Sequence, residues 1–92
     1  MYLEIVSPEA TLFAGEVTSV TVPGINGEFQ MLQNHAPIVS LLQEGEVKVQ
    51  GDITIEEEFQ NKFSKGQNGE TVLAIASGTV EMKENKIIVL AD

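Results

Sequence analysis

The sequence predicts a single all-β domain, a flattened antiparallel β-sandwich or barrel of about ten short strands. Three observations predict it. Apolar residues recur mostly with a period of two or in short blocks, which is the spacing of half-buried strands. Turn residues interrupt these blocks roughly every eight to twelve residues, and no long stretch follows the helical period. The chain has 92 residues, so residues 1–92 are expected to form one domain around one core.

The N-terminal half of the chain is predicted to be a series of short strands closed by turn residues. The expected strands cover residues 2–6, 11–14, 17–22, 28–32, 38–42 and 46–50. Residues 17–22 are rich in Val and Thr, which suit a pleated, half-buried surface. Asn26-Gly27 is a strong turn dipeptide and predicts a tight β-turn before the fourth strand. Along residues 46–50 the two valines should point inward and the polar residues outward.

The C-terminal half contains one irregular stretch, residues 51–70, followed by three clearer strands at 72–76, 79–83 and 86–90. Ile53 and Ile55 predict a strand, while Phe59 and Phe63 are spaced for about one or two helical turns, and residues 65–69 predict a flexible tip. Residues 87–90 are apolar on both faces, so one face should meet the core and the other a further layer or a partner. Residues 37–42 are likewise a candidate for core or interface.

The charge balance excludes several functional classes. Fourteen acidic residues face five basic ones, all lysine, which gives a net charge of −9. Nucleic acid and anionic membrane surfaces would repel such a chain, whereas a basic partner would attract it. The chain has no cysteine, which excludes disulfides and thiolate sites. The start of the chain does not resemble a signal peptide, and no apolar run is long enough to span a membrane, so we expect a cytoplasmic protein without direct membrane insertion.

The side chains that could carry chemistry do not form a recognisable site. His35 is the only histidine, and a loop histidine that is hydrogen-bonded to backbone before Pro37 is favoured over a metal ligand or a general base. A small hydrolase built on His35 and Ser40 is the weakest alternative, because no Gly-x-Ser-x-Gly motif surrounds Ser40. Residues 56–58 form a run of glutamates that is expected to be solvated. We therefore expect no catalytic, cofactor-binding or metal-binding residues.

Several segments resemble the epsilon subunit of F-type ATP synthases. The segments that carry the resemblance are Leu3-Glu4-Ile5-Val6-Ser7-Pro8-Glu9, Val20-Thr21-Val22-Pro23-Gly24, Gly27-Glu28-Phe29, Asn34-His35-Ala36-Pro37, Leu41-Leu42, Ser77-Gly78-Thr79-Val80-Glu81, Asn85-Lys86 and Val89-Leu90-Ala91-Asp92. Together they span nearly the whole chain except residues 51–70. The resemblance implies a flattened β-sandwich and a non-catalytic subunit of the rotary central stalk.

The resemblance also implies partners and site residues. Such a subunit binds the gamma subunit and the ring of c subunits, one copy per complex, and helps to couple proton flow to ATP synthesis at the cytoplasmic face of the bacterial inner membrane. Gly24, Asn26, Gly27 and Glu28 would face the c-ring, with Glu28 meeting its polar, commonly basic loops, which fits the acidic charge balance. Ser7, His35 and Ser40 match positions that face gamma. No cofactor is implied.

Three departures from the family pattern leave questions open. Gln30-Met31-Leu32-Gln33 stands where the family usually has Gly-Ile-Leu-Pro, and residues 51–70 are longer than the usual hairpin. The sequence stops at Asp92, where longer members continue into a helical hairpin that carries ATP binding and inhibition, so a natural short form and a truncation are both open. The alternative function is a stand-alone β-sandwich module that binds a peptide or a small ligand in a pocket with convergent aromatic rings.

Overall fold

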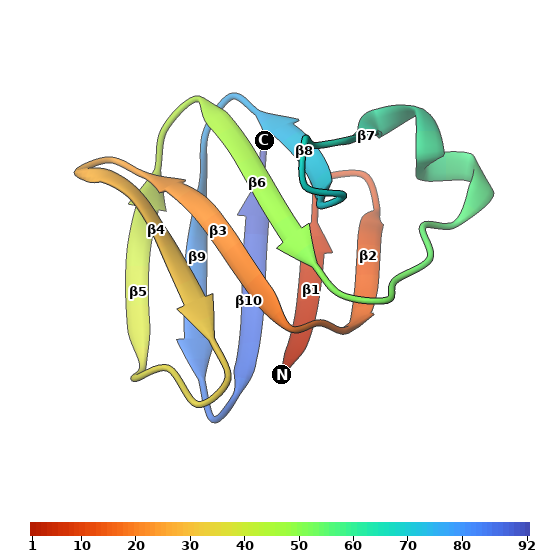
Figure 1. The fold of residues 1–92 in the computed structure, drawn as a ribbon. Helices are drawn as coiled ribbons and strands as arrows, with labels where there is room; N and C mark the ends of the chain where they lie inside the picture. The colour runs from red at the N-terminus through yellow and green to blue at the C-terminus, as the bar shows by residue number, and fades with distance from the viewer.

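The computed structural model describes all 92 residues and contains ten strands and one short 3-10 helix (Figure 1). The elements are β1 (Tyr2–Val6), β2 (Thr11–Glu16), β3 (Ser19–Gly24), β4 (Gly27–Leu32), β5 (Ile38–Leu42), β6 (Gly45–Gln50), η1 (Glu57–Lys62), β7 (Phe63–Lys65), β8 (Thr71–Ile75), β9 (Gly78–Lys83) and β10 (Lys86–Ala91). The predicted all-β class and the predicted number of strands are confirmed.

The strands form one curled sheet that folds into two layers. The strand order is β2-β1-β10-β9-β5-β3-β6-β8-β7, and β4 pairs with β3. β5 and β3 are joined at a single register pair, Gly24 with Leu42, so the sheet bends there. The first layer contains β2, β1, β10, β9 and β5, and β3, β4 and β6 of the second layer cross in front of it (Figure 1). The two layers make the predicted sandwich.

One strand pair departs from the predicted antiparallel pattern. β1 runs parallel to β10, with Leu3 opposite Ile87 and Ile5 opposite Val89, whereas every other pair is antiparallel. A hairpin forces antiparallel pairing only on strands that follow each other in the chain. β1 and β10 are the first and last strands, so no turn connects them and either direction is accessible.

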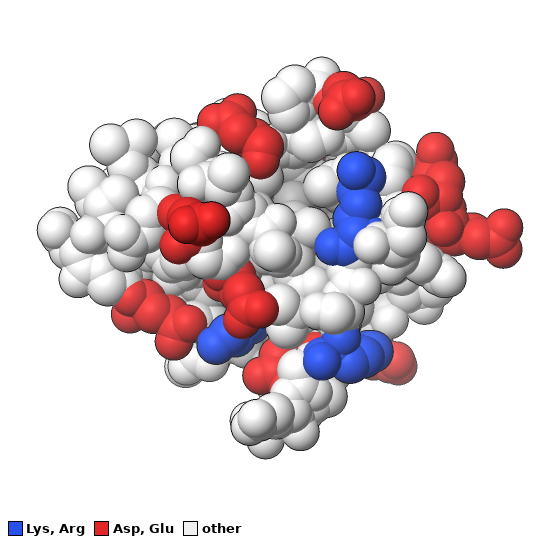
Figure 2. All heavy atoms as spheres, turned by 90° about the horizontal axis from the view of Figure 1, so that it is seen from above, with Lys and Arg blue, Asp and Glu red and all other residues white.

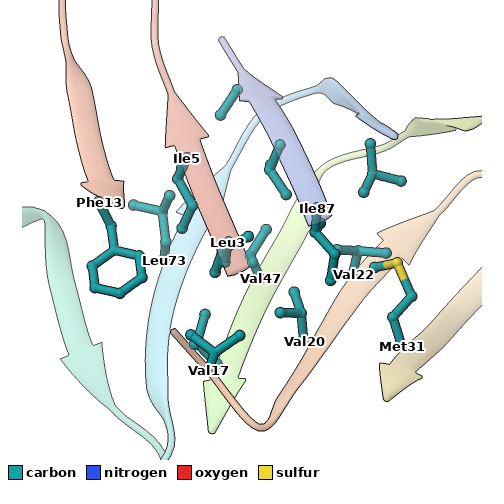
Figure 3. Close-up of a cluster of buried hydrophobic side chains, with 14 of the residues drawn as sticks. Leu3, Ile5, Phe13, Val17, Val20, Val22, Met31, Val47, Leu73 and Ile87 are labelled. Atoms are coloured by element: carbon teal, nitrogen blue, oxygen red, sulfur yellow. The ribbon is translucent and has the colours of Figure 1, made fainter. Parts of the chain in front are cut away.

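The core lies between the layers, and strands such as β1, β6 and β10 contribute alternate residues to it. Leu3, Ile5, Val20, Val47 and Ile87 are completely buried, and Figure 3 shows these side chains directed toward one another from both layers. The two valines of β6 point inward, as predicted. Because such interiors are close-packed, the two layers behave as one stiff body.

The segment between β6 and β7 differs from the sequence-based expectation. The strand predicted at Ile53 and Ile55 is wrong, because residues 53–56 have no regular secondary structure and pair with no strand. The helical turn expected at Phe59 and Phe63 is present as η1, which includes Phe59 and ends just before Phe63. Ile53, Ile55 and Phe59 are half-buried against the core cluster. Their alternation therefore reflects a segment wrapped over the core rather than a paired strand. The predicted tip at residues 65–69 is a hydrogen-bonded turn between β7 and β8.

Candidate functional site

The β3–β4 hairpin ends in the tight turn that Asn26-Gly27 predicted. Gly24 pairs with Gly27, which leaves Ile25 and Asn26 as the two turn residues. Gly27 has φ of 122°, a conformation that side chains disfavour. A Cβ on Gly24 would lie 2.8 Å from the Gly27 main-chain oxygen and 2.8 Å from the Phe29 ring. Both glycines are therefore required by the turn, which projects from the body as an exposed tip (Figure 1).

Glu28 is exposed beside this turn, but its carboxylate already has a partner. Lys48 Nζ of β6 lies 3.3 Å from Glu28 Oε2 and donates a hydrogen bond to it. Both side chains are partly exposed, and ion pairs of this kind contribute about 0–1 kcal/mol. A cation from another molecule could therefore replace Lys48 at little energetic cost. The sequence located Glu28 but held no signal for its pairing with Lys48, which lies 20 residues away.

The outer face of the first layer carries a row of apolar side chains. Leu41 of β5 is in register with Thr79 of β9, Thr79 with Leu90 of β10, and Leu90 with Val6 of β1. Leu41 is 59% exposed and Leu90 is 50% exposed. On β10, Ile87 and Val89 are buried, so the prediction that one face of this strand meets the core is confirmed, and its other face points outward.

Val39 extends this row into a surface that we call the apolar patch, defined as Val39, Leu41 and Leu90, and Ile25 of the adjacent β3–β4 turn borders it. Val39 is 75% exposed and Ile25, at the hairpin tip, is 50% exposed. Ile25, Leu41 and Leu90 also line an open hollow together with Thr79 and Asp92. Residues 37–42 and 87–90 were sequence candidates for an interface, whereas Ile25 was not, because only the fold brings the turn beside β5.

The side chains of the three residues that the family resemblance assigned to the gamma face all form hydrogen bonds with main-chain oxygens of the same chain. Ser7 Oγ donates to Ala10 O at 3.2 Å in the β1–β2 turn. His35 Nδ1 lies 2.7 Å from Ala36 O, so this nitrogen carries the donated proton and His35 is the backbone-bonded loop histidine that the sequence favoured. Ser40 Oγ donates to Leu41 O at 3.1 Å.

These three residues do not form one cluster. Ser7 follows β1 at the end of the sandwich where β10 also ends, whereas His35 precedes β5 at the opposite end. Ser40 lies between them on the inner side of β5, opposite Val80. His35 and Ser40 bond to main-chain carbonyls rather than to each other, which is not the arrangement of a base and its nucleophile.

Acidic side chains are distributed over the end of the molecule that carries the β5–β6 turn, and Figure 2 shows them scattered among few lysines. No three His, Cys, Asp or Glu side chains gather in a group that could hold a metal ion.

The hollow beside η1 is lined by a single aromatic ring, Phe63, among Ile53, Ile55 and polar residues. The structure contains no helix with the length and hydrophobicity of a transmembrane span.

The whole chain, residues 1–92, matches the family model described as ATP synthase, Delta/Epsilon chain, beta-sandwich domain. The ATP synthase epsilon chain of Chlorobaculum tepidum is 37% identical over 90 residues, which cover 98% of this chain and 86% of that protein. The epsilon chain of Campylobacter curvus is 35% identical over 92 residues, so the chain spans 60% of that relative's length.

Among solved structures, a chain of the Tetrahymena thermophila mitochondrial ATP synthase central stalk and c-ring superposes with a TM-score of 0.76. It is 11% identical, with 99% of this chain and 62% of that chain covered, and this likeness shows the fold. The chain therefore belongs to the delta/epsilon β-sandwich family of ATP synthase subunits, as an epsilon-chain domain.

Proposed function

We propose that this domain is the coupling subunit of an ATP synthase rotor, bound to the gamma subunit on one side and to the c-ring on another. It catalyses no reaction of its own, is present once per complex and stays at the cytoplasmic face of the bacterial membrane through that complex. The observation that carries the proposal is the presence of two distinct exposed surfaces on one stiff body, the apolar patch and the glycine-bounded turn.

The apolar patch is the proposed gamma-binding surface. Large exposed side chains that are contiguous on one sheet face mark protein interaction sites, and the centres of such interfaces are apolar. Val39 and Leu41, the two most exposed patch residues, lie on β5 on either side of Ser40, whose own side chain points to the inner side of the strand, so Ser40 would act through the main chain of β5 rather than by direct contact. Ser7 and His35, at the two ends of the sandwich, would contribute only to the polar rim of this interface.

The β3–β4 turn is the proposed c-ring surface. Gly24 and Gly27 allow the tight turn that exposes Asn26, and Glu28 places a carboxylate next to it. Since the Glu28–Lys48 pair is solvent-exposed, a basic group of a c-subunit loop could take over the carboxylate. The acidic balance of the domain, −9, would attract such loops from a distance.

Co-expression with the gamma subunit of the same organism tests this proposal. The domain should co-purify with gamma in a one-to-one ratio, and the gamma–domain pair should then bind isolated c-rings. Leu41→Asp places a charge in the patch and should abolish co-purification while the free domain stays folded, because the side chain points to solvent. A wild-type domain that does not bind gamma would refute the proposal.

A further inference from the structure

The proposed c-ring turn is attached directly to the strand that carries the proposed gamma surface. The Ile25 N–H donates to Leu41 O at 3.2 Å, and the Gln43 N–H donates to Pro23 O at 2.9 Å. A third bond comes from a side chain, because Gln43 Nε2 donates to Gly24 O at 3.0 Å. These three bonds, with the single register pair between Gly24 and Leu42, join the hairpin tip to the end of β5.

We call these contacts, which involve Pro23, Gly24 and Ile25 on one side and Leu41, Leu42 and Gln43 on the other, the joint. Gln43 supplies its only side-chain hydrogen bond. It is an exposed residue in the turn between β5 and β6, yet its side-chain amide donates to a buried residue, Gly24. The turn that it holds is bounded by Gly24 and Gly27, the residue type that loses most conformational freedom on folding. The turn is closed by the pairing of β3 with β4, and the Gln43 amide adds a contact from outside the hairpin that restricts the turn further.

We infer that Gln43 is a positioning residue for c-ring binding: its side chain holds the β3–β4 turn in the orientation that the ring engages. This inference rests on the proposed function. Leu41 has a part in both surfaces, since its side chain belongs to the apolar patch and its main-chain oxygen accepts the bond from Ile25. Force between the c-ring and the gamma subunit would therefore be transmitted through the few residues of this joint rather than through the whole sandwich.

Amide hydrogen exchange on the purified chain tests the joint without any partner. Gln43→Met keeps the length and volume of the side chain but removes the donor. Exchange at the Ile25 amide should become about fivefold faster, the change in open population that one hydrogen bond corresponds to. Core amides such as that of Val89 should be unaffected. Gln43→Lys, which restores a donor, should return the Ile25 rate toward that of the wild type.

The matched control is Gln67→Met, because Gln67 is exposed in the β7–β8 turn and its side chain makes no hydrogen bond in the structure. It should leave the Ile25 rate at the wild-type value. If Gln43→Met leaves that rate unchanged too, or if Gln67→Met raises it equally, the inference is overturned.

The second measurement is binding of the gamma–domain pair to detergent-purified c-rings. Gln43→Met should weaken this binding about fivefold without altering affinity for gamma, and Gln43→Lys should recover it. Faster exchange at Ile25 with unchanged ring binding would overturn the positioning role. Glu28→Lys tests the ring contact itself: if neither this variant nor Gln43→Met changes ring binding, the proposed function fails in its c-ring part, whatever hydrogen exchange reports.

Discussion

Truncation of Leu41 to alanine should weaken gamma binding and leave the free domain stable. Burying a whole Leu side chain is worth about 1.5–3 kcal/mol, and 59% of Leu41 is still exposed in the free domain. About 1–2 kcal/mol is therefore available when a partner covers it, a 5- to 30-fold loss in affinity when it is removed. The free energy of unfolding should change by less than about 0.5 kcal/mol, because an outward-facing side chain contributes little to the core.

Leu32 offers a matched control for this experiment. It is a leucine of similar exposure, 52%, but it projects from the last position of β4 on the outer face of the other layer. Leu32→Ala should leave gamma affinity within about twofold of the wild-type value. Isothermal titration calorimetry with purified gamma gives both affinities, and urea unfolding gives both stabilities. Equal losses for the two variants, or no loss for Leu41→Ala, would show that the apolar patch is not the contact.

Three further substitutions test other parts of the structure. Gly78→Ala should lower the free energy of unfolding by about 1–3 kcal/mol, because the new Cβ would collide with the Leu90 main-chain oxygen across β9 and β10; an unchanged urea midpoint would contradict this. Met31→Ala should cost about 2–5 kcal/mol by leaving a cavity at a fully buried site, measured in the same assay, and a loss below 1 kcal/mol would mean that the core collapses to fill it. Glu28→Lys should reduce proton-coupled ATP synthesis in assembled complexes while the free domain unfolds within about 1 kcal/mol of the wild type, since only an exposed ion pair is lost; unchanged coupling would remove Glu28 from the c-ring contact.

The strands could be predicted from sequence where local pattern and tertiary packing agree. Val47 and Val49 alternate with polar residues because one side of β6 meets the core, and the same alternation sets its exposure. Ile53 and Ile55 show the same pattern but belong to a segment that wraps over the core without pairing. Alternation records which side chains are covered and carries no information on whether the backbone has a neighbouring strand. The parallel pairing of β1 with β10 lacked a local signal for the same reason.

Some parts of the candidate site could likewise be predicted from local sequence patterns, whereas others depend on the tertiary structure. The two-sided apolar pattern of residues 87–90 predicted that one face of this strand would meet the core and the other a further layer or a partner, and the turn at Asn26 was predicted from its dipeptide. The row that joins Leu41 to Leu90 depends on the registers of β5 with β9 and of β9 with β10, which no local pattern encodes. The attachment of the turn through Gln43 depends on side-chain reach across 19 residues of sequence, and only the folded structure reveals it.

The position of the joint explains how a domain this small could serve two partners. Leu41 presents its side chain to one proposed partner, while its main-chain oxygen holds the turn that meets the other. A substitution of the Leu41 side chain leaves that oxygen in place, and a substitution of Gln43 leaves the apolar patch in place. The two surfaces can therefore be weakened separately although they share a strand. The buried side chains of both layers pack against β5 and limit its displacement under load, because a close-packed interior has low compressibility and transmits strain.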